Sequence, residues 1–84
     1  MIAKSTVSFA QLRQFLLDLG FTQSKRGKFW HFEHPSSGTV FGYRPYRAGE
    51  KVTEMDLHMT RRHLDLRGVL DERAFDDRLK KAIA

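Results

Sequence analysis

Cysteine is absent from this sequence, and so is any long apolar run. The first absence excludes disulfide bonds, thiolate catalysis and zinc sites built on cysteine. The second excludes a membrane span, and the segment Met1 to Thr6 lacks the apolar stretch that a signal peptide needs. We therefore expect a soluble protein of the cytoplasm that does not associate with a membrane.

The chain is short and basic. Its 84 residues allow one domain with one core, which buries roughly two-thirds of the surface that the unfolded chain exposes. With 15 Lys and Arg against 10 Asp and Glu, the formal net charge is +5. Such an excess of positive charge favours polyanionic partners.

Three segments begin with an apolar residue followed by Ser, Thr or Asp, which is the start signal of a helix. The three pairs are Val7-Ser8, Val52-Thr53 and Leu70-Asp71, and they predict helices over about 9–19, 54–66 and 72–82. Gln11 completes a capping box in the first helix, and Gly20 is available to end it. The apolar stripe of the second helix is thinner, so we expect one of its sides to face water.

Between the first two helices lie three strand candidates, at about 21–25, 29–34 and 39–44. The turns that separate them are short, so neighbouring strands must run antiparallel. The predicted fold is α+β, with the order α-β-β-β-α, an antiparallel three-stranded sheet and an extra C-terminal helix. It forms a single domain over 1–84, with a core over about 8–67 and the added helix over about 71–83.

Alternation along the strands divides the sheet into two faces. Trp30 and Phe32 point to the helices, and a buried Trp30 needs a partner for its indole N–H. The opposite, open face carries Phe29, His31 and Glu33. The predicted core comprises Phe9, Leu12, Phe15, Leu16, Leu19, Trp30, Phe32, Phe41, Tyr43, Leu57 and Leu64, and in the added helix Phe75, Leu79 and Ile83 form a further stripe.

From Leu12 through Leu64 the sequence resembles the HicA toxin family, also called YcfA-like. The shared features are an amphipathic helix, Gly20-Phe21, a glycine-led strand that ends in Phe32-Glu33-His34-Pro35, a glycine turn, a strand and a second helix. The resemblance implies a double-stranded-RNA-binding-domain-like fold, RNA as the substrate, cleavage that needs no metal or other cofactor, and a HicB-like antitoxin protein as a partner.

The working signature of that family is Gly-Ser-His, followed three residues later by a hydrophobic or aromatic residue. Gly27 matches the glycine and Phe32 the aromatic position, but Lys28 stands in place of the serine and Phe29 in place of the catalytic histidine. The resemblance therefore implies an RNA-binding protein of a toxin–antitoxin type whose ribonuclease activity is weak or absent.

Two interpretations of His31 remain open, one catalytic and one structural. His31 lies on the same strand face as Phe29, about 7 Å along the strand, and could act as a displaced general base that Glu33 orients. Under this reading the chain is an active mRNA interferase that needs no metal. Alternatively, His31 is a solvated polar residue on an exposed strand.

Phe29 also allows two readings. An exposed aromatic beside Lys25, Arg26, Lys28 and Arg44 matches the stacking and phosphate contacts of sheets that bind RNA, and Arg47 adds charge in the following loop. Alternatively, Phe29 packs under the third helix. A third functional reading takes the scaffold as a protein-interaction module, docked through that helix or the open sheet face.

The other histidines have poor spacing for a metal. His31 and His34 point to opposite faces of their strand, and His58 and His63 are five residues apart, so we expect no metal site. The run Arg61-Arg62-His63 could read phosphates, but a positive charge near the C-terminal end of a helix is accounted for by helix polarity.

Overall fold

A computed structural model describes residues 7–83, with the backbone alone at Ile83. The elements are α1 (Phe9–Asp18), β1 (Thr22–Arg26), β2 (Phe29–His34), β3 (Thr39–Tyr43), α2 (Glu54–Leu66) and α3 (Glu72–Ile83). The predicted order α-β-β-β-α with an added helix is confirmed, and most bounds agree within one residue. The prediction for Met1 to Thr6 and the ends of the predicted 1–84 domain lie outside the described residues, as does the Ile83 side chain.

All three predicted helix caps are present. In each cap a side-chain oxygen accepts the backbone N–H three residues further on: Ser8 from Gln11 at 3.2 Å, Thr53 from Asp56 at 3.1 Å, and Asp71 from Ala74 at 2.8 Å. The Gln11 side chain accepts from the Ser8 N–H at 2.9 Å and completes the capping box. Gly20, with φ of 100°, then turns the chain from α1 towards the sheet.

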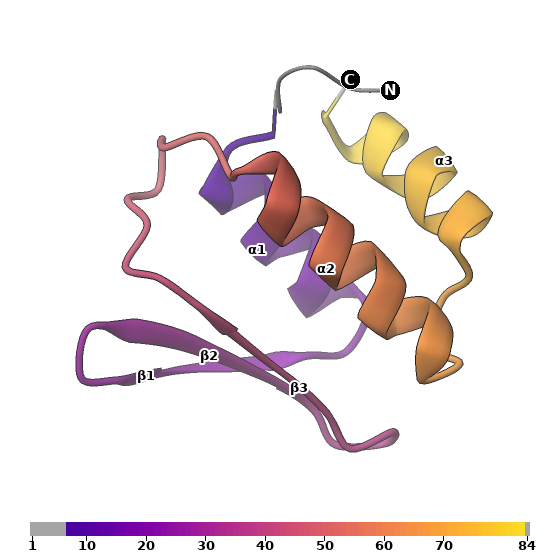
Figure 1. The fold of residues 1–84 in the computed structure, drawn as a ribbon, viewed down its shortest axis with the longest axis horizontal. Helices are drawn as coiled ribbons and strands as arrows, with labels where there is room; N and C mark the ends of the chain where they lie inside the picture. The colour runs from indigo at the N-terminus through magenta and orange to yellow at the C-terminus, as the bar shows by residue number, and fades with distance from the viewer. Residues whose placement is uncertain (1–6, 84) are drawn as a thin grey trace.

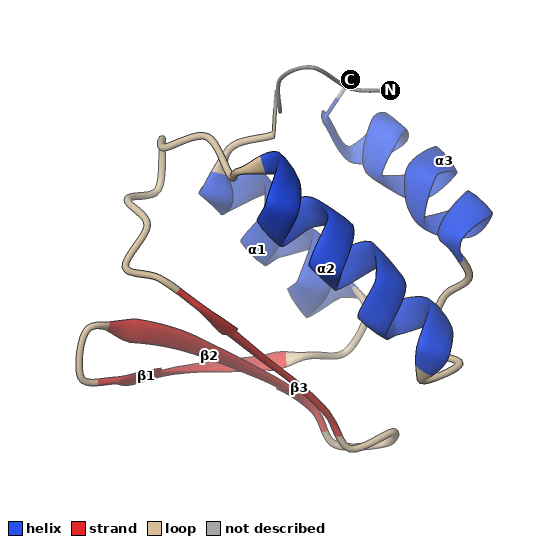
Figure 2. Ribbon diagram, in the orientation of Figure 1, coloured by secondary structure: helices blue, strands red, loops and turns tan. Residues whose placement is uncertain are grey.

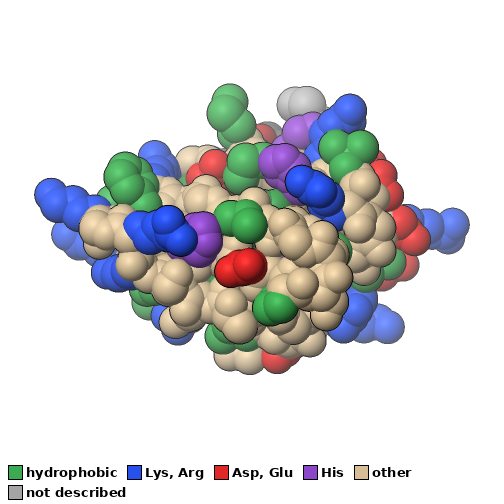
Figure 3. All heavy atoms as spheres, turned by 90° about the horizontal axis from the view of Figure 1, so that it is seen from below, with side chains coloured by type: hydrophobic (Ala, Val, Ile, Leu, Met, Phe, Trp, Pro, Cys, Tyr) green, Lys and Arg blue, Asp and Glu red, His purple; other side chains and the backbone are tan. Residues whose placement is uncertain are grey.

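The molecule has two layers (Figures 1 and 2). The sheet has the order β1-β2-β3 with both pairs antiparallel, and all three helices lie on one side of it. No described element covers the opposite face, which is the face seen in Figure 3. Among the described helices, none combines the length and the apolar character that crossing a bilayer requires.

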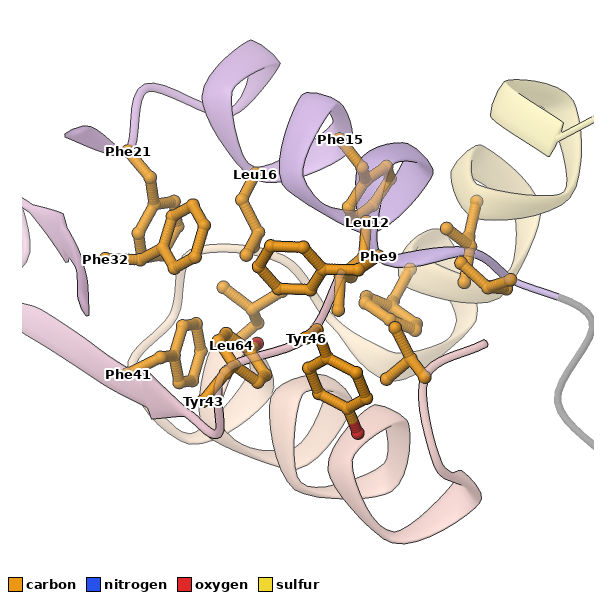
Figure 4. Close-up of a cluster of buried hydrophobic side chains, with 14 residues drawn as sticks. Phe9, Leu12, Phe15, Leu16, Phe21, Phe32, Phe41, Tyr43, Tyr46 and Leu64 are labelled. Atoms are coloured by element: carbon orange, nitrogen blue, oxygen red, sulfur yellow. The ribbon is translucent and has the colours of Figure 1, made fainter. Parts of the chain in front are cut away.

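The core lies between the layers, and aromatic rings fill much of it (Figure 4). The Phe9 side chain is fully buried, and its ring lies 5.1 Å from Trp30 and 5.3 Å from Tyr46 between centroids. The buried hydrophobic residues are Val7, Phe9, Leu12, Phe15, Leu16, Phe21, Phe32, Phe41, Tyr43, Tyr46, Val52, Leu64, Phe75 and Leu79. Burying these rings supplies most of the driving force for a domain of this size.

The predicted core needs three corrections. Leu19, Trp30 and Leu57 are only partly buried and pack against the core from its edge. For Trp30 the reason is its place beside the β1–β2 turn, where β1 is exposed along its whole length. The expected partner of its indole is present, because Nε1–H donates to the Tyr46 carbonyl oxygen at 3.1 Å.

Helix α3 belongs to the helical layer. It packs against both α1 and α2, and its Phe75 ring meets Phe15 edge to face with centroids 5.3 Å apart. Arg61 of α2 joins the two helices from outside, through paired hydrogen bonds to Asp76 and an ion pair with Glu72. The added helix therefore covers an apolar stripe that α1 and α2 leave open.

Candidate nucleic-acid interface

The strand register defines the open face row by row. Arg26 lies opposite Phe29 in the row nearest the β1–β2 turn, and His31 lies between Ser24 and Gly42 in the next. The third row consists of Thr22, Glu33 and Val40. Phe29, His31 and Glu33 thus share the open face, as predicted from alternation.

Positive charge gathers at the end of the sheet where β1 turns into β2. Because Trp30 pairs with Tyr43, the end of β3 lies beside the start of β2, and the residues after β3 join those of the turn. We call this group the basic end; it comprises Lys25, Arg26, Lys28, Arg44 and Arg47, all of them exposed. In Figure 3 Lys and Arg side chains cluster at the left, where Figure 1 shows the β1–β2 turn.

Within the part of the chain that the structure describes, no carboxylate neutralises the charges of the basic end. Across residues 7–83, none of its five side chains forms an ion pair with a carboxylate. The carboxylate of Glu50, in the same loop as Arg47, accepts the Arg47 backbone N–H at 3.1 Å. The cations therefore remain available to an external anion.

Aromatic rings position two of these cations. The Lys25 ammonium lies 4.7 Å from the centroid of the Trp30 ring, and the Arg44 guanidinium lies 4.8 Å from that of Tyr46. The Phe9 ring contacts both aromatics in the core. Such cation–π contacts restrict where a long side chain can go, so part of the basic end is ordered before any ligand binds.

The sequence analysis did not identify Tyr46 as a residue that positions part of the basic end. Its aromatic character within a basic loop was the available signal, but only the structure shows that it is buried and that Arg44 folds back over it.

Phe29 is 58% exposed and lies at the same end of the sheet as these cations, opposite Arg26. The reading in which it packs under the third helix is wrong, because α3 lies in the helical layer on the other side of the sheet. Gly27, with φ of 65°, makes the tight turn that brings Lys28 and Phe29 to the end of the hairpin. An exposed ring at a basic end of the sheet can stack on a base while cations nearby contact phosphates.

His31 lacks an orienting partner. No hydrogen bond or ion pair joins it to Glu33 or to any other side chain among residues 7–83, although both residues lie on the open face. Its neighbour across β3 is Gly42, which offers no side chain. A general base works when a second group fixes its ring and tautomer, and the structure brings no such group to His31.

His34 has the partners that His31 lacks. Its Nε2 lies 3.1 Å from the Leu19 carbonyl oxygen, which can only accept, so Nε2 carries the proton and Nδ1 accepts from the Ser37 hydroxyl at 2.8 Å. Ser37 Oγ in turn accepts from the Thr39 hydroxyl at 2.7 Å and from the Thr39 N–H at 3.3 Å.

This His–Ser pair holds the fold together and is not a nucleophile. Every hydrogen-bonding position of Ser37 Oγ is used, so no lone pair is free to attack a substrate. The network ties the end of α1 to the β2–β3 turn. Sequence reasoning missed it, although a His-Pro-Ser-Ser-Gly run before a strand was a visible sign of a hydrogen-bonded turn.

The remaining candidates have structural or weaker roles. Arg61 pairs with α3, which explains this residue better than helix polarity does, and its hydrogen bonds to Asp76 raise the pKa of the guanidinium. The His63 ring contacts Phe41 at 5.6 Å between centroids, and His58 is exposed. Within residues 7–83 no three histidines or carboxylates lie close enough together to hold a metal ion.

Comparison with known proteins adds no family. No family model matches the chain, no curated protein matches it, and no solved structure matches it.

Proposed function

We propose that this chain is a HicA-like RNA-binding protein of a toxin–antitoxin type in which ribonuclease activity is weak or absent. One observation carries the proposal: five exposed cations that form no ion pair among residues 7–83 lie at the same end of the sheet as an exposed phenylalanine. A HicB-like antitoxin protein is the proposed protein partner, in the cytoplasm.

The chemistry of the basic end fits a single-stranded or looped polynucleotide. Lys and Arg side chains neutralise phosphates and release counterions, which supplies affinity without sequence preference. A flat ring such as Phe29 adds stacking on an unpaired base, which a duplex does not offer. RNA is preferred over DNA on the resemblance alone.

The same geometry supports binding without cleavage. Phe29 occupies the position that corresponds to the family's catalytic histidine, and a phenyl ring cannot transfer a proton. His31 lies on the same face, but no group among residues 7–83 orients it. The bound RNA is therefore expected to stay intact.

The binding test reverses two charges that aromatic rings position. Lys25→Glu with Arg44→Glu should weaken binding of a fluorescent single-stranded RNA on the order of 100-fold at about 0.1 M salt. The slope of log affinity against log salt should fall by about 1.4, since each lost phosphate contact removes about 0.7 for a single strand. Fluorescence anisotropy measures both.

A matched control reverses two exposed arginines of α3, Arg73→Glu with Arg78→Glu, which changes the net charge by the same amount. This control should keep most of the affinity. Equal losses in both variants would contradict a localised site. If the wild type shows no binding even at low salt, RNA binding is excluded and the protein-interaction reading takes its place.

A degradation assay tests the catalytic part separately. Wild type, His31→Ala and the double variant Lys28→Ser with Phe29→His are incubated with single-stranded RNA and a chelator. We expect no cleavage by the first two and measurable cleavage by the double variant. Cleavage by the wild type that His31→Ala abolishes, with RNA affinity unchanged, would establish His31 as a displaced base.

A further inference from the structure

Helix α2 presents a second surface, which the proposed RNA site does not use. Met55 is 81% exposed and Leu66 is 71% exposed, although both are large hydrophobic residues on an ordered helix. Met59, which is half-buried against the core, and the exposed Arg62 lie between them at the spacing of one helix face, so these four residues form a continuous stripe. In Figures 1 and 2, α2 lies in front of α1, and no described element covers its outer side.

The stripe has the spacing of a coiled-coil seam. Its positions follow one another by four, three and four residues, which is the d-a-d-a sequence of two heptads. Met59, Arg62, His63 and Leu66 also line a shallow depression of about 140 Å³ on the surface. Residues i, i+3, i+4 and i+7 are the set that forms a hole for a side chain of a facing helix.

We propose that α2 of a second copy of this chain occupies the stripe. The two helices run antiparallel, and the two-fold axis crosses the stripe between Met59 and Arg62. In this arrangement Met55 faces Leu66 of the second copy. Met59 of each copy enters the depression on the other copy. The stripe is therefore complementary to itself, as a two-fold interface requires. Methionine adapts its shape to such a hole because its side chain is flexible and polarisable.

Polar side chains beside the stripe favour a second copy as the partner and the antiparallel direction of the two helices. Antiparallel pairing brings the His58 imidazole near the Asp65 carboxylate of the second copy on one flank, and both residues are exposed. A parallel pair would instead bring His58 near His63 of the second copy, which carries no opposite charge. Arg62 is the one charged residue of the seam, and its stem can lie along apolar surface while the guanidinium reaches water.

Single-cysteine variants test this arrangement cleanly, because the native chain contains no cysteine. Met55→Cys and Leu66→Cys proteins, one of them carrying a mass tag, are mixed and oxidised mildly. We expect the mixed disulfide to exceed either disulfide between identical variants by about tenfold, because residues 55 and 66 face each other only in the antiparallel pair. Dominant disulfides between identical variants would overturn the antiparallel arrangement.

Val40→Cys is the control for random collision. Val40 is 48% exposed and lies on the open face of the sheet, away from the stripe. If the mixture of Met55→Cys and Leu66→Cys cross-links no more than Val40→Cys does with itself, the pairing is excluded.

Sedimentation equilibrium tests association without oxidation. The wild type should show an average mass that rises above 9.8 kDa with concentration, and Leu66→Asp should weaken the association at least tenfold while circular dichroism stays unchanged. His58→Glu should also weaken it, and His58→Glu with Asp65→Lys should restore it. A wild type that stays monomeric up to about 1 mM would overturn the proposal.

Discussion

The two ends of the sheet differ in whether their polar side chains have partners inside the protein. At the β2–β3 turn, His34, Ser37 and Thr39 bond to one another and to the Leu19 carbonyl, so each group is satisfied inside the protein. At the β1–β2 turn, the cations of the basic end have no carboxylate partner among the described residues. The first end explains part of the stability, and the second is the one that can bind something else.

The comparison also bears on energy. Hydrogen bonds among partly buried groups each add about 0.5–1.5 kcal/mol to stability. Like charges held within a Debye length of about 10 Å repel one another and oppose folding. A polyanion that neutralised the basic end would remove this repulsion, so ligand binding and stability should be linked.

The largest expected effect breaks the satisfied end. His34→Ala removes two hydrogen bonds and the contact of the imidazole with Phe21, whose ring lies 4.9 Å away. We expect the free energy of unfolding to fall by about 2–3 kcal/mol, measured by urea denaturation monitored by circular dichroism.

Ser36→Ala is the control for this loss, because Ser36 is exposed in the same turn and its replacement should change stability by no more than about 0.5 kcal/mol. The affinity of folded His34→Ala protein for RNA should stay at the wild-type value. A loss of affinity at a temperature where the variant is folded would contradict the separation of the two ends.

The fold was predictable because its signals are local. Helix caps require only residues three apart, as with Ser8 and Gln11, and strand alternation assigned Phe32 to the core and Phe29 to the open face. The completion of the core was not fully predictable, because burial of Tyr46 depends on how the loop after β3 folds back over Phe9.

The candidate site was predictable in its residues and not in its partners. The basic run before Phe29 is visible in the sequence, and antiparallel pairing brings Arg44 to it. The pairing of Arg61 with Asp76 joins residues 15 apart on different helices, and the link from His34 to Leu19 also spans 15 residues. Such contacts depend on tertiary packing, which local patterns do not report.

A smaller effect sharpens the role of the open end. Phe29→Ala should weaken single-stranded RNA binding by about 1–2 kcal/mol, or roughly tenfold, through loss of stacking. Stability should change little because the ring is mostly exposed. Anisotropy titrations measure the affinity, and Phe29→Tyr should restore it.

Val40→Ala removes another exposed hydrophobic side chain from the same face, two rows away from Phe29, and serves as the control. An equal loss of affinity in this variant would mean that the whole face, and not the basic end, contacts RNA.

The smallest effect concerns a buried hydroxyl beneath the basic end. Tyr43 precedes Arg44, and its O–H donates to Thr60 Oγ1, which donates to the Asp56 carbonyl oxygen. Burial raises the pKa of Tyr43 above its ordinary value near 10, although the hydrogen bond to Thr60 opposes the shift. The neutral phenol is thus the form that the folded protein holds.

The sign of the pH dependence follows. Below about pH 10 the phenol is protonated in both the folded and the unfolded chain, so its contribution to stability is fully present. As pH rises further, the unfolded chain releases the proton first and stability falls until the folded pKa is passed.

The Tyr43→Phe variant has no hydroxyl to ionise at this position. Above about pH 10, the difference in free energy of unfolding between wild type and variant should therefore shift in favour of the variant. At neutral pH the variant should lose only about 0.5–1.5 kcal/mol, because Thr60 keeps its bond to Asp56. Urea denaturation of both proteins from pH 7 to 11 measures the difference; a constant value across that range would mean that the Tyr43 hydroxyl reaches water, and that even the polar group under the basic end is not satisfied internally.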